Sequence, residues 1–142
     1  MSDSQLFEDT FLITDVNAQK YDRVTRLAGM SVDADTALTL DVNSELYPVE
    51  VGEHITLMLA NTLNLDGTKM GERGWRDQGV GDVTLADMYD YVCYGKVYRF
   101  EEGEGDMIRV FVSFGGLLLY LEGPYKKLTG LRIDYVYMLV KR

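Results

Sequence analysis

Cysteine and histidine are nearly absent from this sequence of 142 residues. Cys93 is the single cysteine and His54 the single histidine. One thiol excludes an internal disulfide and a zinc site built from several cysteines. The histidine has no cysteine or second histidine near it in sequence, which leaves no nucleophile–base pair for covalent catalysis. We therefore expect no catalytic residues, and a protein suited to a reducing intracellular compartment.

Motifs for metals, nucleotides and membranes are missing as well. Asp33-Ala34-Asp35 begins like a calcium-binding loop, but Ser44 stands at the twelfth position, where a bidentate glutamate is needed. There is no Gly-Lys-Ser/Thr phosphate loop. No hydrophobic run approaches the length that spans a bilayer, so we expect a soluble chain. The sequence thus predicts no metal, no cofactor, no small-molecule substrate and no membrane partner.

Positive charge is scarce. Fourteen Lys and Arg stand against 23 Asp and Glu, which gives a net charge of -9. The charge is concentrated in residues 1–60, with a net of -8, while residues 61–87 carry -2 and residues 88–142 carry +1. Such a chain is a poor general ligand for nucleic acid, and a basic protein surface is a more natural partner.

Strand-forming patterns dominate the rest of the sequence. Eight segments are rich in strand formers and follow a period of two, which places one face of a β-strand against a core. They are Thr10–Val16, Val24–Met30, Ala37–Val42, His54–Leu59, Tyr89–Phe100, Met107–Phe114, Leu117–Leu121 and Tyr135–Val140. The alternation is clearest in Leu38, Leu40 and Val42 and in Ile55, Leu57 and Leu59. Gly103–Asp106 and Gly115-Gly116 read as hairpin turns, and a short helix fits only around Leu85–Met88 or Tyr125–Leu128. The pattern predicts an all-β, closed or nearly closed antiparallel barrel.

A glycine-rich segment separates the first four strands from the last four. Residues 61–87 hold five glycines between Asn64 and Gly81 and few β-branched residues, so we expect a long mobile loop there. Trp75 either anchors this loop on the barrel or contacts a partner. The length favours a single barrel domain over residues 1–142, with a first half at 1–60 and a second half at 88–142.

Tyrosine is abundant in the second half, which holds eight of the ten. A tyrosine joins a large apolar ring to a polar tip, which suits a surface half-buried by a partner, but it also suits a hydrogen-bonded core position. Stacking on nucleic-acid bases is a third interpretation. Lys96, Tyr98 and Arg109 favour it, whereas Glu101 and Glu102 oppose it.

The apolar run Leu117-Leu118-Leu119 predicts a docking surface. Both faces of this strand are apolar, although a strand with one solvated face should alternate. The face turned away from the core needs cover from this chain or from a partner. Gly115-Gly116 is either a tight turn or a place where a foreign backbone approaches. The candidate partner-binding residues are Tyr91, Tyr94, Gly95, Lys96, Gly115, Gly116, Leu117 and Leu118.

Several segments together resemble the eighth subunit shared by the eukaryotic RNA polymerases I, II and III. They are Phe7-Glu-Asp-Thr-Phe11, Tyr21-Asp-Arg-Val24, Leu38–Asn43 with Glu45–Pro48, Asp90–Tyr98, and Ser113–Leu119 with Leu121–Gly123. The resemblance covers nearly the whole chain. It implies an eight-stranded barrel of two related four-stranded halves, similar to an oligonucleotide-binding fold and docked on the largest polymerase subunit. It also implies residence in the nucleus, including the nucleolus, and a role in assembly without catalysis.

The resemblance also raises binding to single-stranded nucleic acid. It assigns that property to the N-terminal region, where Lys20, Tyr21, Arg23 and Arg26 offer cations and one ring. The net charge of -8 in residues 1–60 opposes a polyanion, so we expect only weak or indirect binding. The alternative function is a free-standing barrel that binds single strands. A small barrel enzyme or ligand carrier is more remote, because no reactive group of residues is present.

Overall fold

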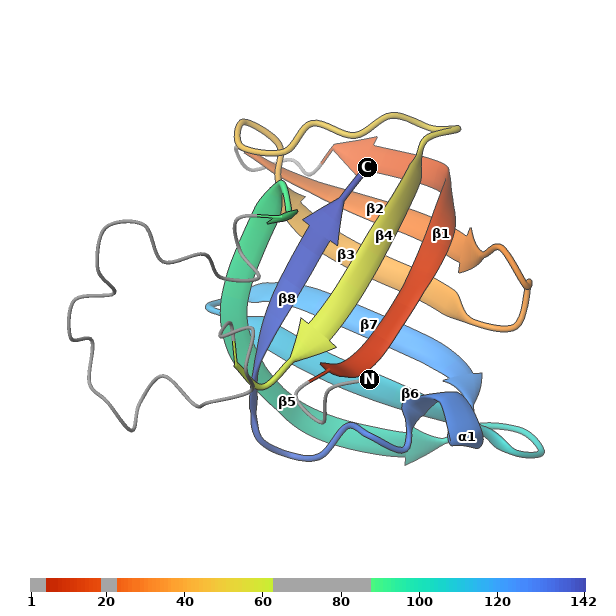
Figure 1. Cartoon of the computed structure of the whole chain (residues 1–142). Helices are drawn as coiled ribbons and strands as arrows, with labels where there is room; N and C mark the ends of the chain where they lie inside the picture. Colours follow the sequence, from red (N-terminus) through yellow and green to blue (C-terminus); the bar gives the residue numbers. More distant parts are fainter. Residues whose placement is uncertain (1–4, 19–22, 63–87) are drawn as a thin grey trace, which may run out of the picture.

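The structure, a computed structural model, describes residues 5–18, 23–62 and 88–142. These residues form a closed antiparallel barrel with one short helix (Figure 1). The elements in chain order are β1 (Gln5–Ala18), β2 (Val24–Ser31), β3 (Ala37–Asn43), β4 (His54–Ala60), β5 (Tyr91–Glu102), β6 (Met107–Phe114), β7 (Leu117–Pro124), α1 (Tyr125–Leu128) and β8 (Tyr135–Lys141). All eight predicted strands are confirmed, and the all-β fold class with them.

The barrel consists of two four-stranded halves. The strand order is β1-β2-β3-β7-β6-β5-β8-β4, and the last strand closes on the first. The strands before residue 61 are therefore contiguous, as are those after residue 87. Two antiparallel seams join the halves, β3 with β7 and β4 with β8. The prediction of a barrel built from two halves is confirmed.

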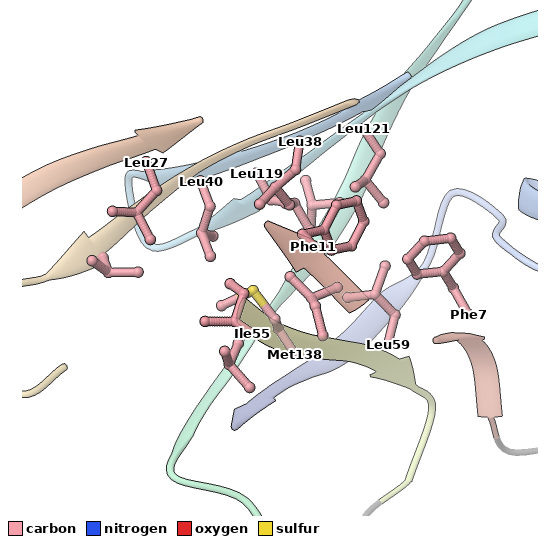
Figure 2. Packing of buried hydrophobic residues seen from close by; sticks show 14 of the residues in the cluster. Phe7, Phe11, Leu27, Leu38, Leu40, Ile55, Leu59, Leu119, Leu121 and Met138 are labelled. Atoms are coloured by element: carbon pink, nitrogen blue, oxygen red, sulfur yellow. The ribbon is translucent and has the colours of Figure 1, made fainter. Parts of the chain in front are cut away.

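Alternating residues of both halves fill the interior. Leu38 and Leu40 of β3 and Leu119 of β7 are at most 1% exposed, because every second side chain of these strands points inward. Figure 2 shows leucines of these two strands gathered around Phe11 of β1, close to Met138 of β8. One apolar core therefore holds both halves together.

The glycine turns between the later strands have the expected conformations. Gly115 has φ +66° and Gly116 φ +103°, so both lie in the left-handed region that favours glycine. Positive φ at both positions is what a two-residue type I′ hairpin requires. The hairpins β5–β6 and β6–β7 confirm the predicted turns at Gly103–Asp106 and Gly115-Gly116. The turn itself thus favours glycine at 115 and 116.

The helix α1 covers one end of the barrel beside β6, β7 and β1 (Figure 1). It confirms the prediction at Tyr125–Leu128, and its Leu128 is fully buried. No helix within residues 5–18, 23–62 and 88–142 is long and apolar enough to cross a membrane. The predictions for the loop at 64–81 and for Trp75 lie outside the described residues, as does nearly all of Leu85–Met88.

Candidate docking surface

Tyr91 belongs to the core and not to the outer surface. It is 7% exposed, and its ring stacks on Tyr47 at a centroid distance of 5.2 Å. Its hydroxyl accepts a hydrogen bond from the backbone N–H of Asn43 at 3.1 Å. Burial raises the pKa of Tyr91 to about 12. The expectation that its side chain meets a partner is therefore corrected, because the ring points into the barrel.

Tyr94 and Lys96 do lie on the outside of β5. Tyr94 is 54% exposed, and its ring lies parallel to that of Tyr135 on β8 at 5.6 Å. Tyr137 packs against the same ring at 4.6 Å. The Lys96 ammonium lies 5.3 Å from the centre of the Tyr135 ring, within the range of a cation–π contact. Some of the tyrosines thus fill the core, while these three form an aromatic row on the surface.

Gly95 has an intramolecular reason to be glycine. A Cβ atom built there would lie 2.1 Å from the carbonyl oxygen of Ser113 and 2.9 Å from the Cα atom of Phe114. The backbones of β5 and β6 approach too closely to admit a side chain. Gly95 is also buried, so it does not itself lie on the surface. Its contribution is to let β5 and β6 pack closely together.

Leu118 lies on the outside of β7, next to the turn. It is 39% exposed, whereas Leu119 beside it is 1% exposed and belongs to the core. Leu117 is partly buried against that core. The face of β7 turned away from the core therefore presents an apolar side chain that the described residues do not fully cover.

The strand registers bring the predicted residues into one row. Leu118 pairs with Ser113, Ser113 with Lys96, and Lys96 with Tyr135, so one line crosses β7, β6, β5 and β8. Directly opposite residues on paired strands point to the same face. Lys96 and Leu118, which are 22 positions apart in sequence, therefore share one outer face of the barrel.

Asp41 extends this row onto β3, and sequence reasoning missed it. It is 5% exposed, and its Oδ2 accepts a hydrogen bond from the Leu118 N–H at 3.1 Å. The Arg26 guanidinium binds the same carboxylate with two hydrogen bonds, of 2.7 and 3.0 Å. The one available signal was cross-strand pairing of opposite charges, because Arg26 and Asp41 stand opposite each other in the β2–β3 hairpin.

Of the candidate nucleic-acid residues, the two that the structure describes are each paired with a carboxylate. The Arg26 guanidinium donates two hydrogen bonds to the Asp41 carboxylate, and these bonds raise the pKa of Arg26. Arg23 is exposed and paired with Glu45 at 3.1 Å. Lys20 and Tyr21 lie outside the described residues. The charges of both candidate arginines are thus compensated by carboxylates of the same chain, which weakens the electrostatic case for binding a phosphate backbone.

The residues considered for catalysis are far from a reactive arrangement. His54 is exposed at the start of β4. Cys93 is half-buried, and burial raises the pKa of its thiol. In the described part of the chain, no three His, Cys, Asp or Glu residues group closely enough to hold a metal ion. Nothing in this geometry supports acid–base, nucleophilic or metal-assisted chemistry.

Comparison with known proteins places the whole chain in one family. Residues 8–142 match the family model described as RNA polymerase Rpb8. The chain is 43% identical to "DNA-directed RNA polymerases I, II, and III subunit RPABC3" of Saccharomyces cerevisiae, covering 96% of this chain and 97% of the relative. The protein of that name in Schizosaccharomyces pombe is 39% identical over 100% of both chains. "DNA-directed RNA polymerases II, IV and V subunit 8B" of Arabidopsis thaliana is 39% identical, over 96% of this chain and 94% of its own. This chain therefore belongs to the RNA polymerase Rpb8 family.

Proposed function

We propose that this chain is a non-catalytic structural and assembly subunit common to the DNA-directed RNA polymerases I, II and III. The observation that carries the proposal is similarity at 39–43% identity, over essentially the full length, to relatives named as the subunit shared by these three enzymes. The chain acts in transcription as a shared subunit and not as the catalytic one. Its partners are the other polymerase subunits, and its location is the nucleus.

At a finer level, the chain docks on the largest subunit through the outer face of β5 to β8. The row of Leu118, Ser113, Lys96 and Tyr135 supports this choice, with Tyr94 beside it. The row combines an exposed aliphatic side chain with stacked aromatic rings, which is the composition of protein interfaces. The second half also carries a net charge of only +1, so it repels an acidic partner less than the acidic first half does.

Docking in all three enzymes implies that the chain also occupies the nucleolus.

An affinity-tagged chain purified from nuclear extract tests the function directly. The expected result is recovery of subunits of all three polymerases, with the largest subunit of each among the proteins cross-linked to the tag. Failure to recover polymerase subunits would refute the function. Affinity for a naked single strand at physiological salt, without polymerase subunits, would instead support the free-standing alternative.

The docking face is tested with Leu118→Asp, matched by Leu46→Asp in the β3–β4 connection. Leu118 is 39% exposed and Leu46 is 70% exposed, so neither change buries a charge in the core. We expect both variants to melt near the wild-type temperature and only Leu118→Asp to lose recovery with the largest subunit. Undiminished recovery of folded Leu118→Asp would place the docking surface elsewhere. Gly116→Arg is less informative, because φ +103° at this position strains any side chain.

A further inference from the structure

A small open groove lies on the outer face of the barrel beside Leu118. It holds about 240 Å³, and its walls come from β2, β3, β5, β6 and β7. Its lining includes Tyr98, Phe111, Leu118, Tyr120, Thr39 and Arg26. This volume is below the roughly 300–1,000 Å³ of typical small-molecule sites, so the groove has room for one large side chain and not for an extended ligand.

The paired part of the seam between β3 and β7 ends beside the groove. The paired residues of this seam run from Ala37 with Glu122 only as far as Leu40 with Leu119. At the next position of β7, the Leu118 N–H donates to the side chain of Asp41 and not to a β3 carbonyl. A side chain thus takes the place of the backbone ladder at the position where Leu118 turns outward.

Aromatic rings make the walls of the groove apolar. Phe111 packs against Tyr120 at a centroid distance of 5.1 Å and against Tyr98 at 6.2 Å, in tilted geometries that favour aromatic pairs. Phe111 and Tyr120 are half-buried, and Tyr98 is 46% exposed. Three rings in contact, with Leu118 beside them, form an exposed apolar patch of the kind that marks an interaction site.

The cations around the groove are already neutralised. Arg26 is bound to Asp41. Arg99, which lies over the Phe111 ring at 5.7 Å, forms an ion pair with Glu101. Around Tyr120, Arg109 is paired with Glu122 at 3.0 Å and with Glu101 at 3.8 Å. The groove therefore presents aromatic surface with its charges compensated, which complements an uncharged apolar group and offers a phosphate backbone no free cation among these arginines.

We propose that this groove receives one large apolar side chain, aliphatic or aromatic, from a segment of a polymerase subunit that docks along Leu118. The inference rests on the proposed function and adds the position and the chemistry of a central contact. Tyr98, Phe111 and Tyr120 hold the incoming side chain. The Arg26–Asp41 pair is a positioning device, because it fixes the Leu118 N–H and with it one wall of the groove.

The first test places the photo-crosslinking residue p-benzoylphenylalanine at position 98 of the full chain in assembled polymerase. Position 125 is the matched control, because Tyr125 is 59% exposed on α1 and does not line the groove. We expect irradiation to join position 98 to another polymerase subunit at an apolar residue, and position 125 to give no such product. A product with nucleic acid, or none from assembled polymerase, would overturn the proposal.

The second test measures incorporation in competition. Wild-type chain and Tyr98→Ser, carrying different tags, are expressed at equal levels, and their ratio in purified polymerase is determined. We expect at least about tenfold less Tyr98→Ser, as for the loss of one aromatic anchor, and equal incorporation for Tyr125→Ser. If folded Tyr98→Ser is incorporated as well as the wild type, the groove does not receive an anchoring side chain. Recovery of the wild type with polymerase in the same experiment would leave the proposed function unaffected. If Tyr98→Ser does not fold, the crosslinking result decides.

Discussion

At the scale of single residues, Gly95 is fixed by the backbone of the neighbouring strand. We expect Gly95→Ala to lower the free energy of unfolding by about 2–3 kcal/mol, because its Cβ would overlap the Ser113 carbonyl and force β5 and β6 apart. Urea denaturation measures this change. Gly105→Asn is the comparison, since Gly105 has φ +64° and open space around it, and asparagine tolerates that conformation at a cost under about 1 kcal/mol. Equal losses in the two variants would contradict the steric explanation.

Cys93 offers a second test at this scale. Its half-buried thiol packs against the core, and burial raises its pKa from the ordinary value of 9.0. The thiolate is the reactive form, so we expect the folded chain at pH 8 to react with a disulfide reagent several times more slowly than a free thiol does. Unfolding in urea should restore the ordinary rate. A fast reaction in the folded chain would show an activated thiol and would support a nucleophilic role for Cys93.

At the scale of elements, one lysine attaches the short helix α1 to the first half of the barrel. The Lys127 ammonium donates to Asp9 of β1 and, at 2.9 Å, to Asp35 in the β2–β3 turn. Its hydrogen bond lowers the pKa of Asp35. Burial by itself would lower the pKa of Lys127, but the two carboxylates outweigh burial and raise it. The helix is too short to be stable alone, so these contacts and the buried Leu128 hold it in place.

We expect Lys127→Met to lose about 2 kcal/mol of stability at neutral pH, because it leaves the partly buried Asp9 without its cation. A carboxyl group whose pKa is lower in the folded than in the unfolded chain stabilises the fold at any pH above its unfolded-state pKa. This stabilisation is lost as the pH falls from the unfolded-state pKa through the folded-state pKa. The difference between wild type and Lys127→Met should therefore shrink below about pH 3.8, the ordinary pKa of Asp35. Chemical denaturation from pH 3 to 8 measures it, with the exposed Lys126→Met as control. A difference that does not change with pH would contradict the ion-pair explanation.

At the scale of the whole molecule, the two halves complete each other. Each half is an open four-stranded sheet until the seams β3–β7 and β4–β8 close the barrel. Leu119, which is 1% exposed, sits at one seam and packs in the shared core. This arrangement supports the single-domain prediction, which implies one cooperative unfolding transition.

We expect Leu119→Ala to cost about 2–5 kcal/mol and to destabilise both halves equally. Hydrogen exchange measures this, because protected amides of β1 to β4 and of β5 to β8 should report the same loss in free energy. The matched change Leu118→Ala, on the outer face of the same strand, should cost less than about 1 kcal/mol. Faster exchange confined to the second half would show that the halves unfold separately and that the chain is not one folding unit.

The sequence by itself determined the elements of this protein and its family. Strand-forming residues and a period of two identified the eight strands, since inward and outward positions of a half-buried strand differ locally in hydrophobicity. Gly115-Gly116 identified its hairpin because few other residues adopt its backbone conformation. The lack of a reactive group of residues and the polymerase-like motifs indicate a non-catalytic subunit from the sequence alone.

Only the tertiary structure decided which residues share a surface. Tyr91 and Tyr94 look alike in sequence, yet one fills the core and the other is 54% exposed, because three positions along a strand reverse the face. The sequence offers Arg26 as a phosphate-binding residue, whereas the hairpin register places it opposite Asp41, to which it donates a hydrogen bond. The Leu118 N–H binds Asp41 where two strands from different halves end their pairing. Such contacts join residues distant in the chain, so no local pattern of side chains encodes them.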